Sequence, residues 1–309
     1  MTNTDFEKIV DTSDEWITTR TGIKERRIAS AEEATSDMAV AACRNALDMA
    51  SVANEDIDML ILGTVTPDYR LPSCACVVQE KMGLPNAMAF DIVSACTGFI
   101  NGLSIAQSFI ESGKYKKIMV VGVEKLSSIT NYHDRSTCIL FGDAAGAAVV
   151  SAETNGKGVL ASFLKSDGRM RELLWISKGG SVNPYISGET LNGSDKIFMN
   201  GGDVFKTAVR EMGRAAMKVL EEAGVAPEQV GFVIPHQANV RIIESLAKRL
   251  GISMDKVYVN IERFGNTSAA SIPLALDEAN RAGRIKDGDY VLMMAFGGGL
   301  TWGASLMKW

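Results

Sequence analysis

The stretch from residue 87 to residue 110 constrains the fold more than any other part of the sequence. Residues 87–93 form an apolar run, small residues dominate 94–98, and residues 99–110 carry apolar side chains at helical spacing. This order predicts a buried strand, a sharp turn and a buried helix. Such strands favour a parallel sheet that helices cover on both faces.

Cys96 lies where the predicted turn becomes the helix. At that position the unpaired backbone N–H groups and the helix dipole favour a thiolate over a thiol. The small neighbouring residues would let a substrate approach the sulfur closely. A core cysteine is the alternative, and it is the more common fate of a free cysteine. We therefore interpret Cys96 as a candidate nucleophile that is expected to be ionised.

Strands and helices are predicted to alternate along the rest of the chain. Helices are expected at 35–51, 73–82, 204–223, 239–250 and 268–282, and strands at 59–65, 117–123, 146–151, 161–164, 232–234, 257–259, 290–295 and 304–307. The order appears twice at a period near half of the chain, which indicates a duplicated architecture. We expect one half over residues 1–160 and the other over 161–309. Residues 165–203, rich in Gly, Ser and Asn, are expected to form a surface excursion.

The composition is that of an ordinary globular protein, with 46% hydrophobic and 22% charged residues. The formal net charge of −5 argues against non-specific binding to nucleic acid. No apolar run approaches the ~20 residues of a membrane span. Five scattered cysteines predict reduced thiols in the cytoplasm. The spacing of Cys74 and Cys76, without a histidine cluster, argues against a metal site.

Three further motifs stand at expected strand ends, where open α/β sheets place their active sites. His236 precedes a predicted helix, and imidazole is the side chain best suited to proton transfer near neutral pH. The amide of Asn266 could donate a hydrogen bond to an oxyanion, with a helix N-cap as the alternative. The glycines at 297–299 could offer N–H groups to the same charge or form a tight hairpin. His133 lies in a polar loop, where a surface role is expected.

Seven motifs spread over nearly the whole chain occur in the order found in a known family. They lie at residues 11–17 (DTSDEWI), 20–23 (RTGI), 134–137 (DRST), 141–147 (FGDAAGA), 235–239 (PHQAN), 265–270 (GNTSAA) and 297–303 (GGGLTWG). In these motifs the chain resembles the thiolase superfamily and, within it, the β-ketoacyl-acyl-carrier-protein synthase III family. The resemblance implies an α/β fold of two similar halves, each a mostly parallel five-strand sheet with helices, stacked as layers.

The resemblance implies the catalytic set Cys96, His236 and Asn266. Elongating ketoacyl synthases use one cysteine and two histidines, whereas thiolases use a second cysteine near the C-terminus. Here no cysteine follows Cys138, and His133 lies outside the motif of the second histidine. The set that remains resembles that of the synthase that primes fatty-acid synthesis.

The implied reaction is a decarboxylative Claisen condensation that initiates fatty-acid synthesis. Cys96 would take the acyl group of an acyl-CoA, with acetyl-CoA as the expected primer, while the N–H groups of Cys96 and Gly298 hold the oxyanion. Malonyl-acyl carrier protein would then lose CO2, and His236 and Asn266 would stabilise the enolate. Attack of the enolate on the acyl-cysteine gives a β-ketoacyl-acyl carrier protein. The resemblance implies no metal and no other cofactor, since acyl-CoA is a substrate.

The resemblance also implies three sets of binding residues, which would otherwise be interpreted as core or solvated surface. The expected CoA site comprises Thr12, Trp16, Arg20, Arg135, Gly201, Phe205, Ala238 and Asn239. The expected primer pocket comprises Leu126, Phe141, Met199 and Phe296, with Leu71 reaching into the pocket of a partner subunit. Arg241, Lys248 and Arg249 form the expected dock for an acidic carrier protein.

The resemblance implies that strand 88–92 lies at a sheet edge and pairs with its twin in a homodimer, and so apolar a strand would invite aggregation if its edge were left open. The resemblance further implies that the first strand of the N-terminal half is missing from this chain. We expect that strand to belong between strands 59–65 and 117–123, so that its loss leaves a vacant slot and unpaired backbone groups. An earlier natural start, or a weakly stable protein that its dimer holds together, would follow.

Two other functions remain open at this level. A hydrolase would form the same acyl-Cys96 and pass the acyl group to water. Asn266 argues against it, because hydrolysis needs a base to activate water and an enolate donor adds nothing. A non-catalytic module that binds carrier protein or forms dimers would not need the complete set of cysteine, histidine and asparagine. The sequence leaves the length and branching of the primer open.

Overall fold

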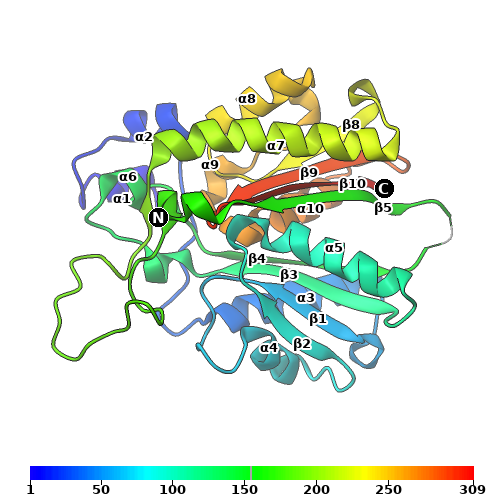
Figure 1. The fold of residues 1–309 in the computed structure, drawn as a ribbon, viewed down its shortest axis with the longest axis horizontal. Coiled ribbons are helices and arrows are strands. Elements are labelled where there is room, and N and C mark those ends of the chain that lie inside the picture. The colour runs from blue at the N-terminus through cyan, green and yellow to red at the C-terminus, as the bar shows by residue number, and fades with distance from the viewer. Residues whose placement is uncertain (154) are drawn as a thin grey trace.

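The computed structural model describes residues 1–153 and 155–309, in which two sheets and three layers of helices alternate (Figure 1). Two central helices, α5 (Gly98–Glu111) and α10 (Ser271–Arg281), lie between the sheets and contact both of them. The outer faces of the two sheets are covered by further helices. The layers place the beginnings of both central helices near each other in the middle of the molecule.

The N-terminal sheet has the strand order β2-β1-β3-β4. Its strands are β1 (Met59–Gly63), β2 (Met88–Ile92), β3 (Lys117–Glu124) and β4 (Ala144–Ser151). β1 is parallel to β2 and to β3, and β4 is antiparallel to β3. The helices α3 (Thr35–Ala50) and α4 (Cys74–Met82) pack on the outer face.

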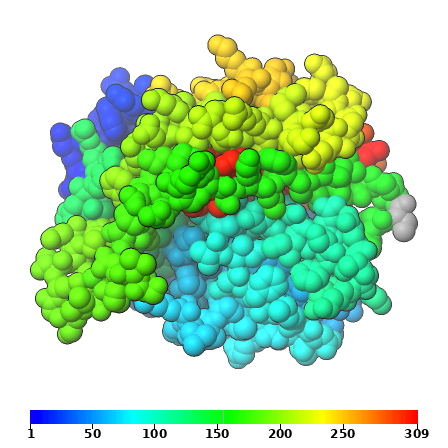
Figure 2. Space-filling model, in the orientation of Figure 1, coloured from blue at the N-terminus to red at the C-terminus, as the bar shows by residue number. Residues whose placement is uncertain are grey.

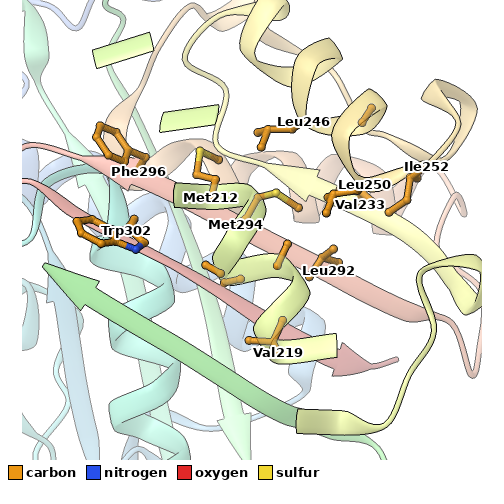
Figure 3. Packing of buried hydrophobic residues seen from close by; sticks show 14 of the residues in the cluster. Met212, Val219, Val233, Leu246, Leu250, Ile252, Leu292, Met294, Phe296 and Trp302 are labelled. Carbon is orange, nitrogen blue, oxygen red and sulfur yellow. The ribbon is translucent and has the colours of Figure 1, made fainter. Parts of the chain in front are cut away.

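The C-terminal sheet has the strand order β5-β10-β9-β8. Its strands are β5 (Gly158–Ser166), β8 (Val230–Pro235), β9 (Tyr290–Gly297) and β10 (Thr301–Lys308). β8 is parallel to β9, whereas β10 is antiparallel to both β9 and β5. The helices α7 (Gly201–Ala223) and α8 (Val240–Leu250) cover its outer face, where Met212, Val219, Leu246 and Leu250 pack against Leu292 and Met294 (Figure 3).

Several short elements complete the fold. They are α1 (Asn3–Phe6), α2 (Asp14–Thr21), α6 (Arg135–Cys138), α9 (Ile261–Phe264), the hairpin of β6 (Leu174–Trp175) and β7 (Phe198–Met199), and the 3₁₀ turns η1 (Asn54–Asp56), η2 (Ala95–Thr97), η3 (Leu126–Ile129), η4 (Gly168–Leu173), η5 (Pro227–Gln229), η6 (Met254–Lys256) and η7 (Ser268–Ala270). None of the helices in the described parts of the chain combines the length and apolar character that crossing a membrane requires.

The apolar strands β1 and β3 are buried on both faces because successive side chains point to opposite sides. Leu60 and Leu62 face α3 and α4, whereas Met59 and Ile61 face the central helices. This explains why the sequence shows continuous apolar runs rather than alternation in these strands. The continuous apolar runs predicted these strands correctly, but without alternation they could not indicate which side chains face which layer of helices.

Two glycines let the central layer approach the N-terminal sheet closely. A side chain at Gly63, at the end of β1, would lie 2.9 Å from the backbone of Gly98, where α5 begins. A side chain at Gly122 in β3 would lie 2.2 Å from the carbonyl oxygen of Ala269 in η7. Backbone therefore packs directly on backbone at both points, which brings η2 and η7 together above the strand ends.

The expected repetition of strands and helices in two halves is present, but its details differ from the prediction. Each main sheet contains four strands within residues 1–153 and 155–309, which is the number expected for an N-terminal sheet without its first strand and one fewer than expected for the C-terminal sheet. In the C-terminal sheet β5, β8 and β9 run in one direction, as a mostly parallel sheet requires, and β10 runs against them. Residues 257–259 do not form a strand, because only Val257 pairs, in a single bridge to Val233. β5 spans the expected boundary at residue 160, so the assignment of 1–160 and 161–309 stays a prediction.

The prediction of a vacant slot between residues 59–65 and 117–123 is wrong. β1 and β3 pair directly along Met59–Gly63, with Met59 opposite Ile118 and Gly63 opposite Gly122. The C-terminal half shows where the reasoning failed, because its own opening strand, β5, lies at the sheet edge beside β10. The matching place in the N-terminal half is beyond β4, so no inner strand is unpaired.

The expected surface excursion at 165–203 stands out from the body of the protein, at the lower left of Figure 2. Its apolar side chains Val182 and Ile186 are 98% and 65% exposed, so they pack against no core of this chain. Inside the excursion, the Nζ of Lys178 lies 2.6 Å from Oε2 of Glu189. Arg70, from the loop after β1, lies 5.3 Å above the ring of Tyr185. The excursion thus contacts the loop that carries Leu71.

Candidate active site

Cys96 occupies the middle of η2, between the end of β2 and the start of α5. Ala95 has a φ of +48°, a left-handed conformation that costs energy in a residue with a side chain. The turn is held at Ser94, whose carbonyl oxygen accepts hydrogen bonds from the hydroxyl groups of Thr97 at 2.7 Å and Thr301 at 3.2 Å. Such supported strain is typical of functional sites.

The turn of glycines after β9 lies against the nucleophile. A side chain at Gly297 would lie 2.6 Å from the backbone nitrogen of Cys96, so only glycine fits there. The next residue, Gly298, packs beside Ala95 and Leu174. The glycine turn thus contacts the backbone of Cys96 through Gly297, and the expected oxyanion role of the Cys96 and Gly298 N–H groups stays a prediction.

The expectation that Cys96 rests as a thiolate is wrong. Burial raises the pKa of the Cys96 thiol to about 12, and the nearby Glu124 carboxyl acts in the same direction. The hydroxyl of Ser268 lowers the pKa by hydrogen bonding, but less than burial raises it. The thiol must therefore lose its proton when it reacts rather than before.

His236 follows the end of β8 and is 2% exposed. Its Nδ1 lies 2.6 Å from the hydroxyl oxygen of Ser271 at the start of α10. That oxygen also accepts a hydrogen bond from the Gln237 N–H at 3.4 Å, which leaves it a second lone pair and its own proton. When the hydroxyl donates to Nδ1, the imidazole carries its proton on Nε2, and that atom is then a donor. Burial lowers the pKa of His236 to about 4, so the ring is neutral at pH 7.

Asn266 lies just before η7 and is 8% exposed. Its backbone pairs with the segment that follows α6. The Asn266 N–H donates a hydrogen bond to the Leu140 carbonyl oxygen at 2.8 Å, and Asn266 forms a β-bridge with Phe141. Its side-chain Oδ1 accepts a hydrogen bond from the Ser268 N–H at 2.9 Å. Because the oxygen is used in this way, the amide group keeps its two N–H donors for a ligand. The alternative of a helix N-cap is met by the same bond, because the Asn266 oxygen binds the first N–H of η7, which runs directly into α10 at Ser271.

Cys96, His236 and Asn266 line one cavity of about 540 Å³. The three come from different elements, at the ends of β2 and β8 and at η7, and only the folded chain brings them together. Expected binding residues on the same wall are Trp16, Arg20, Phe141, Met199, Gly201, Phe205, Ala238, Asn239, Arg241 and Phe296. Phe296 and Met212 stand near one another at one end of the C-terminal core (Figure 3).

Two arginines surround the indole of Trp16 at the cavity. The guanidinium carbons of Arg20 and Arg135 lie 5.3 Å and 5.0 Å from the ring centroid. Arg135 also donates a hydrogen bond to the carbonyl oxygen of Asp11 at 2.8 Å. Beside it, the hydroxyl oxygen of Thr12 is buried and finds no hydrogen-bond partner among the described residues. An aromatic ring, two cations and a free hydroxyl suit a ligand with a planar base and phosphates.

The other expected site residues lie outside the cavity wall, and Thr12, Arg135 and Gly298 are among them. Leu126 is 1% exposed and packs behind the wall in the cluster that contains Phe141. Leu71 points outward and is 88% exposed. Lys248 and Arg249 lie on the exposed surface of α8. Their expected roles stay predictions.

The sequence did not indicate several further residues of the cavity wall. They are Thr21, Ser136, Ile139, Leu140, Leu174, Gly202, Val204, Lys206, Ala208, Met212 and Ile242. Val204, Ala208 and Met212 recur every four residues along α7, so their periodicity does predict a buried face. It does not distinguish a face that lines a cavity from one that packs in the core. Within the described residues, no cluster of His, Cys, Asp and Glu could hold a metal ion.

Comparisons with known proteins agree with this geometry. The sequence profile of the 3-oxoacyl-[acyl-carrier-protein] synthase III family matches residues 90–168, and that of its C-terminal part matches residues 220–309. A β-ketoacyl-[acyl-carrier-protein] synthase III of Caldanaerobacter subterraneus is 55% identical over 100% of this chain and 93% of its own length. The corresponding protein of Clostridioides difficile is 52% identical over 99% and 93%.

Solved structures support the same grouping. The 3-oxoacyl-[acyl-carrier-protein] synthase III of Aquifex aeolicus has a TM-score of 0.93 and 52% identity, covering 100% of this chain and 95% of that one. The synthase III of Thermus thermophilus has a TM-score of 0.93 and 46% identity, with the same coverage. The α/β fold of two similar halves that the motifs implied is confirmed.

The depressed pKa of His236 predicts an acid-labile native state. An unfolded histidine, with its ordinary pKa of 6.5, binds a proton at higher pH than the native one at about 4. Between these values the unfolded chain binds more protons, so acidification favours unfolding. From pH 7.5 to pH 5, the wild type should lose about 2 kcal/mol of stability that a His236→Gln variant keeps. Urea unfolding at both pH values measures the difference.

The control for this prediction is His133→Gln, which changes the exposed histidine of a surface loop. That variant should retain the pH dependence of the wild type. An identical loss of stability in the wild type and in His236→Gln would contradict the prediction.

Proposed function

Since the chain belongs to the 3-oxoacyl-[acyl-carrier-protein] synthase III family, also named β-ketoacyl-[acyl-carrier-protein] synthase III, we propose that it condenses an acyl-CoA primer with malonyl-acyl carrier protein. The products are a β-ketoacyl-acyl carrier protein, CoA and CO2, and the reaction initiates fatty-acid synthesis. The observation that carries the proposal is that Cys96, His236 and Asn266 line the same cavity as Trp16 and Arg20. Acetyl-CoA is the proposed primer.

The first half-reaction is acyl transfer to Cys96. The sulfur attacks the thioester carbonyl, and the carbonyl oxygen becomes an oxyanion between the N–H groups of Cys96 and Gly298. Preorganised donors of this kind contribute about 3 kcal/mol each to the lowering of the barrier. CoA then leaves. Its adenine would stack on Trp16 and its phosphates would bind Arg20 and Arg135, with Thr12 supplying a hydroxyl.

The second half-reaction needs hydrogen-bond donors and no strong base. Loss of CO2 from the malonyl group leaves an enolate, whose oxygen requires donors in a site that excludes water. The Nε2–H of His236 and the side-chain N–H of Asn266 would be such donors. The Ser271 hydroxyl is hydrogen-bonded to the other ring nitrogen of His236, Nδ1, and the Ser268 N–H donates to the side-chain oxygen of Asn266. The enolate carbon attacks the acyl-Cys96 carbonyl and releases the β-keto product.

The proposed primer and CoA sites divide the cavity. Phe141, Met199 and Phe296, with Leu126 behind them, would surround the acyl group, and Gly201, Phe205 and Ala238 would line the channel to the CoA base. Asn239 caps α8 and donates a hydrogen bond to the Arg20 carbonyl oxygen at 3.1 Å. It therefore also holds the backbone of Arg20 in place at the cavity. No metal and no other cofactor take part in the proposed chemistry. The five free cysteines agree with the proposed cytoplasmic location.

Three substitutions test the division of labour in the catalytic set. Cys96→Ser should abolish uptake of label from radioactive acetyl-CoA. His236→Ala and Asn266→Ala should lower the rate of CO2 release from malonyl-acyl carrier protein by about 10²–10³-fold, and acylation much less, because each removes one donor to the enolate. Unimpaired decarboxylation by His236→Ala would contradict the assignment. Free acid without ketoacyl product would instead favour the hydrolase.

We propose that the carrier protein docks on the basic surface of α8. Arg241 lines the cavity mouth, and Lys248 and Arg249 lie further along the same helix. The stem of Arg249 lies in the space that a side chain at Gly213 of α7 would fill. This packing holds the guanidinium between the two helices. Such a patch would speed the association of an acidic partner and make its rate sensitive to salt.

Charge reversal tests this dock. Arg249→Glu should raise the apparent KM for malonyl-acyl carrier protein severalfold at low salt and leave the acylation of Cys96 unchanged, because the change affects encounter rather than chemistry. Arg44→Glu, on the exposed surface of α3 in the other half, makes the same change in net charge and serves as the control. Equal values of KM for both variants and the wild type would reject the patch.

We propose that two copies of the chain pair through β2. β2 is an edge strand, and apolar side chains are exposed beside it, with Val93 79% and Met88 51% accessible. Leu71 is 88% exposed on the neighbouring loop, in reach of a second copy rather than of its own cavity. An apolar edge that a partner covers is protected against uncontrolled pairing.

Val93→Asp should convert the proposed dimer into a monomer, because it places a charge in the contact. Sedimentation analysis measures the mass. Met217→Asp, at a 47% exposed position on the outer helix α7, is the control and should keep the mass of the wild type. A monomeric and fully active wild type in dilute solution would rule the dimer out.

A further inference from the structure

One buried carboxyl group lies behind the nucleophile and has no part in the mechanism above. Glu124 ends β3 and is 0% exposed. Its Oε2 accepts hydrogen bonds from the Thr64 hydroxyl at 3.1 Å, the Val65 N–H at 3.0 Å and the Thr66 hydroxyl at 2.7 Å. Its Oε1 accepts one from the Ser268 hydroxyl at 3.1 Å. All four donors are uncharged, and burial of a carboxyl group without a cation is costly.

Ser268 connects this carboxyl group with Cys96. It belongs to η7, which packs against η2, and its hydroxyl acts on the pKa of the Cys96 thiol. Ser268 has a φ of +49°, a strained conformation for a residue with a side chain, which its N–H bond to Asn266 supports. A hydroxyl has one proton and two lone pairs. When that proton bonds to Glu124, a lone pair remains for the S–H group of Cys96.

Among the groups that surround Glu124, Cys96 is the one that can carry a charge of its own. Cys96 is the titratable group of η2, and its charge is coupled to that of Glu124. Residues 64–66 present hydroxyl groups and one N–H, η7 presents a hydroxyl group, and β4 places Ala144 opposite the glutamate. The ammonium group of Lys125 points away, to two backbone carbonyl oxygens in the loop before α3.

We propose that Ser268 and Glu124 form a proton relay that serves the acylation of Cys96, an inference that rests on the proposed function. As the bond from Sγ to the thioester carbon forms, the S–H bond breaks and its proton passes to the Ser268 hydroxyl oxygen. The original proton of that hydroxyl passes to Oε1 of Glu124. When the tetrahedral adduct collapses, the carbon–sulfur bond to CoA breaks, and the relay returns the proton to the CoA sulfur. Atoms and electrons balance without a co-reactant.

The acid–base properties of the pocket agree with the relay. Burial raises the pKa of Glu124 to about 7, so the carboxyl group is partly ionised at neutral pH and can accept a proton. His236, with a pKa lowered to about 4, is a weaker proton acceptor. The thiol of Cys96, with a pKa of about 12, needs a base in order to attack. Glu124 touches no reacting atom and acts only through Ser268.

Single-turnover acylation by radioactive acetyl-CoA tests the relay. In the wild type, the rate should rise with pH and level off above a midpoint near the pKa of Glu124. Glu124→Gln keeps the shape of the side chain and removes the base. It should lower the rate on the order of 100-fold at pH 7.5 and abolish this midpoint. Ser268→Ala should do the same, and the double variant should be no slower than Ser268→Ala alone, because one break already interrupts the relay.

A second variant separates the relay from a merely structural role of Glu124. Thr66→Val removes a donor that lowers the pKa of Glu124. It should therefore shift the midpoint of acylation to higher pH and keep the rate at the plateau. Thr207→Val, at a buried position of α7, is the matched control and should leave the midpoint unchanged. Urea unfolding of each variant reports its stability separately.

The outcomes distinguish the relay from the function on which it rests. A wild-type protein that takes up no label would overturn both. A wild-type protein that is labelled, with Glu124→Gln labelled at the same rate and with the same midpoint, would overturn the relay alone. Loss of rate in Glu124→Gln but not in Ser268→Ala would also overturn it, since Glu124 would then act by another route. If Glu124→Gln fails to fold, an unchanged midpoint in Thr66→Val overturns the relay.

Discussion

The site depends on direct packing of backbone on backbone in the middle of the molecule. Gly63 and Gly122 end or nearly end two strands of the N-terminal sheet, and the chain segments that begin α5 and α10 lie against them. Because no side chains intervene, η2 and η7 are drawn together over the strand ends. A side chain at either glycine would have to push the corresponding turn outwards. Cys96 and Asn266 would then separate.

This close packing also explains the electrostatics of the site. A group enclosed by two sheets and two helices loses its hydration, and the charged form of each titratable side chain becomes less favourable. Burial raises the pKa values of Cys96 and Glu124 and lowers that of His236. All three shifts favour neutral groups. The cavity can therefore stabilise charge only where it appears during the reaction, through fixed donors.

Neighbouring hydroxyl groups give the buried polar residues their orientation. The Ser271 hydroxyl forms a hydrogen bond with Nδ1 of His236, and Ser268 contacts both Asn266 and Glu124. These serines belong to η7 and to the first residue of α10, so one short segment positions three side chains of the site. The same short segment packs against the turn that carries Cys96, the proposed acyl acceptor, and holds the side chains proposed as donors to the enolate. The two proposed half-reactions would therefore depend on one segment of the chain.

The sequence by itself determined most of the local elements and the residues that are proposed for the site. The strands β1 and β3 were predicted from continuous apolar runs, and the helix α7 from apolar residues at helical spacing. Both signals extend over only a few residues and are therefore visible in the sequence. The motifs around Cys96, His236 and Asn266 were equally visible, because each is a short contiguous stretch. The resemblance in those motifs also implied the fold that the solved relatives confirm.

Only the tertiary structure decided which strands are neighbours and which groups are charged. The pairing of β1 with β3 depends on contacts between residues about sixty positions apart, and local patterning contains no information about it. The helix N-terminus at Cys96 suggested a thiolate, but burial by the opposite half of the chain dominates and raises the pKa. Glu124 escaped notice for the same reason. A glutamate after an apolar strand is ordinary in sequence, and it becomes significant only when β1, β3 and η7 enclose it together with Cys96.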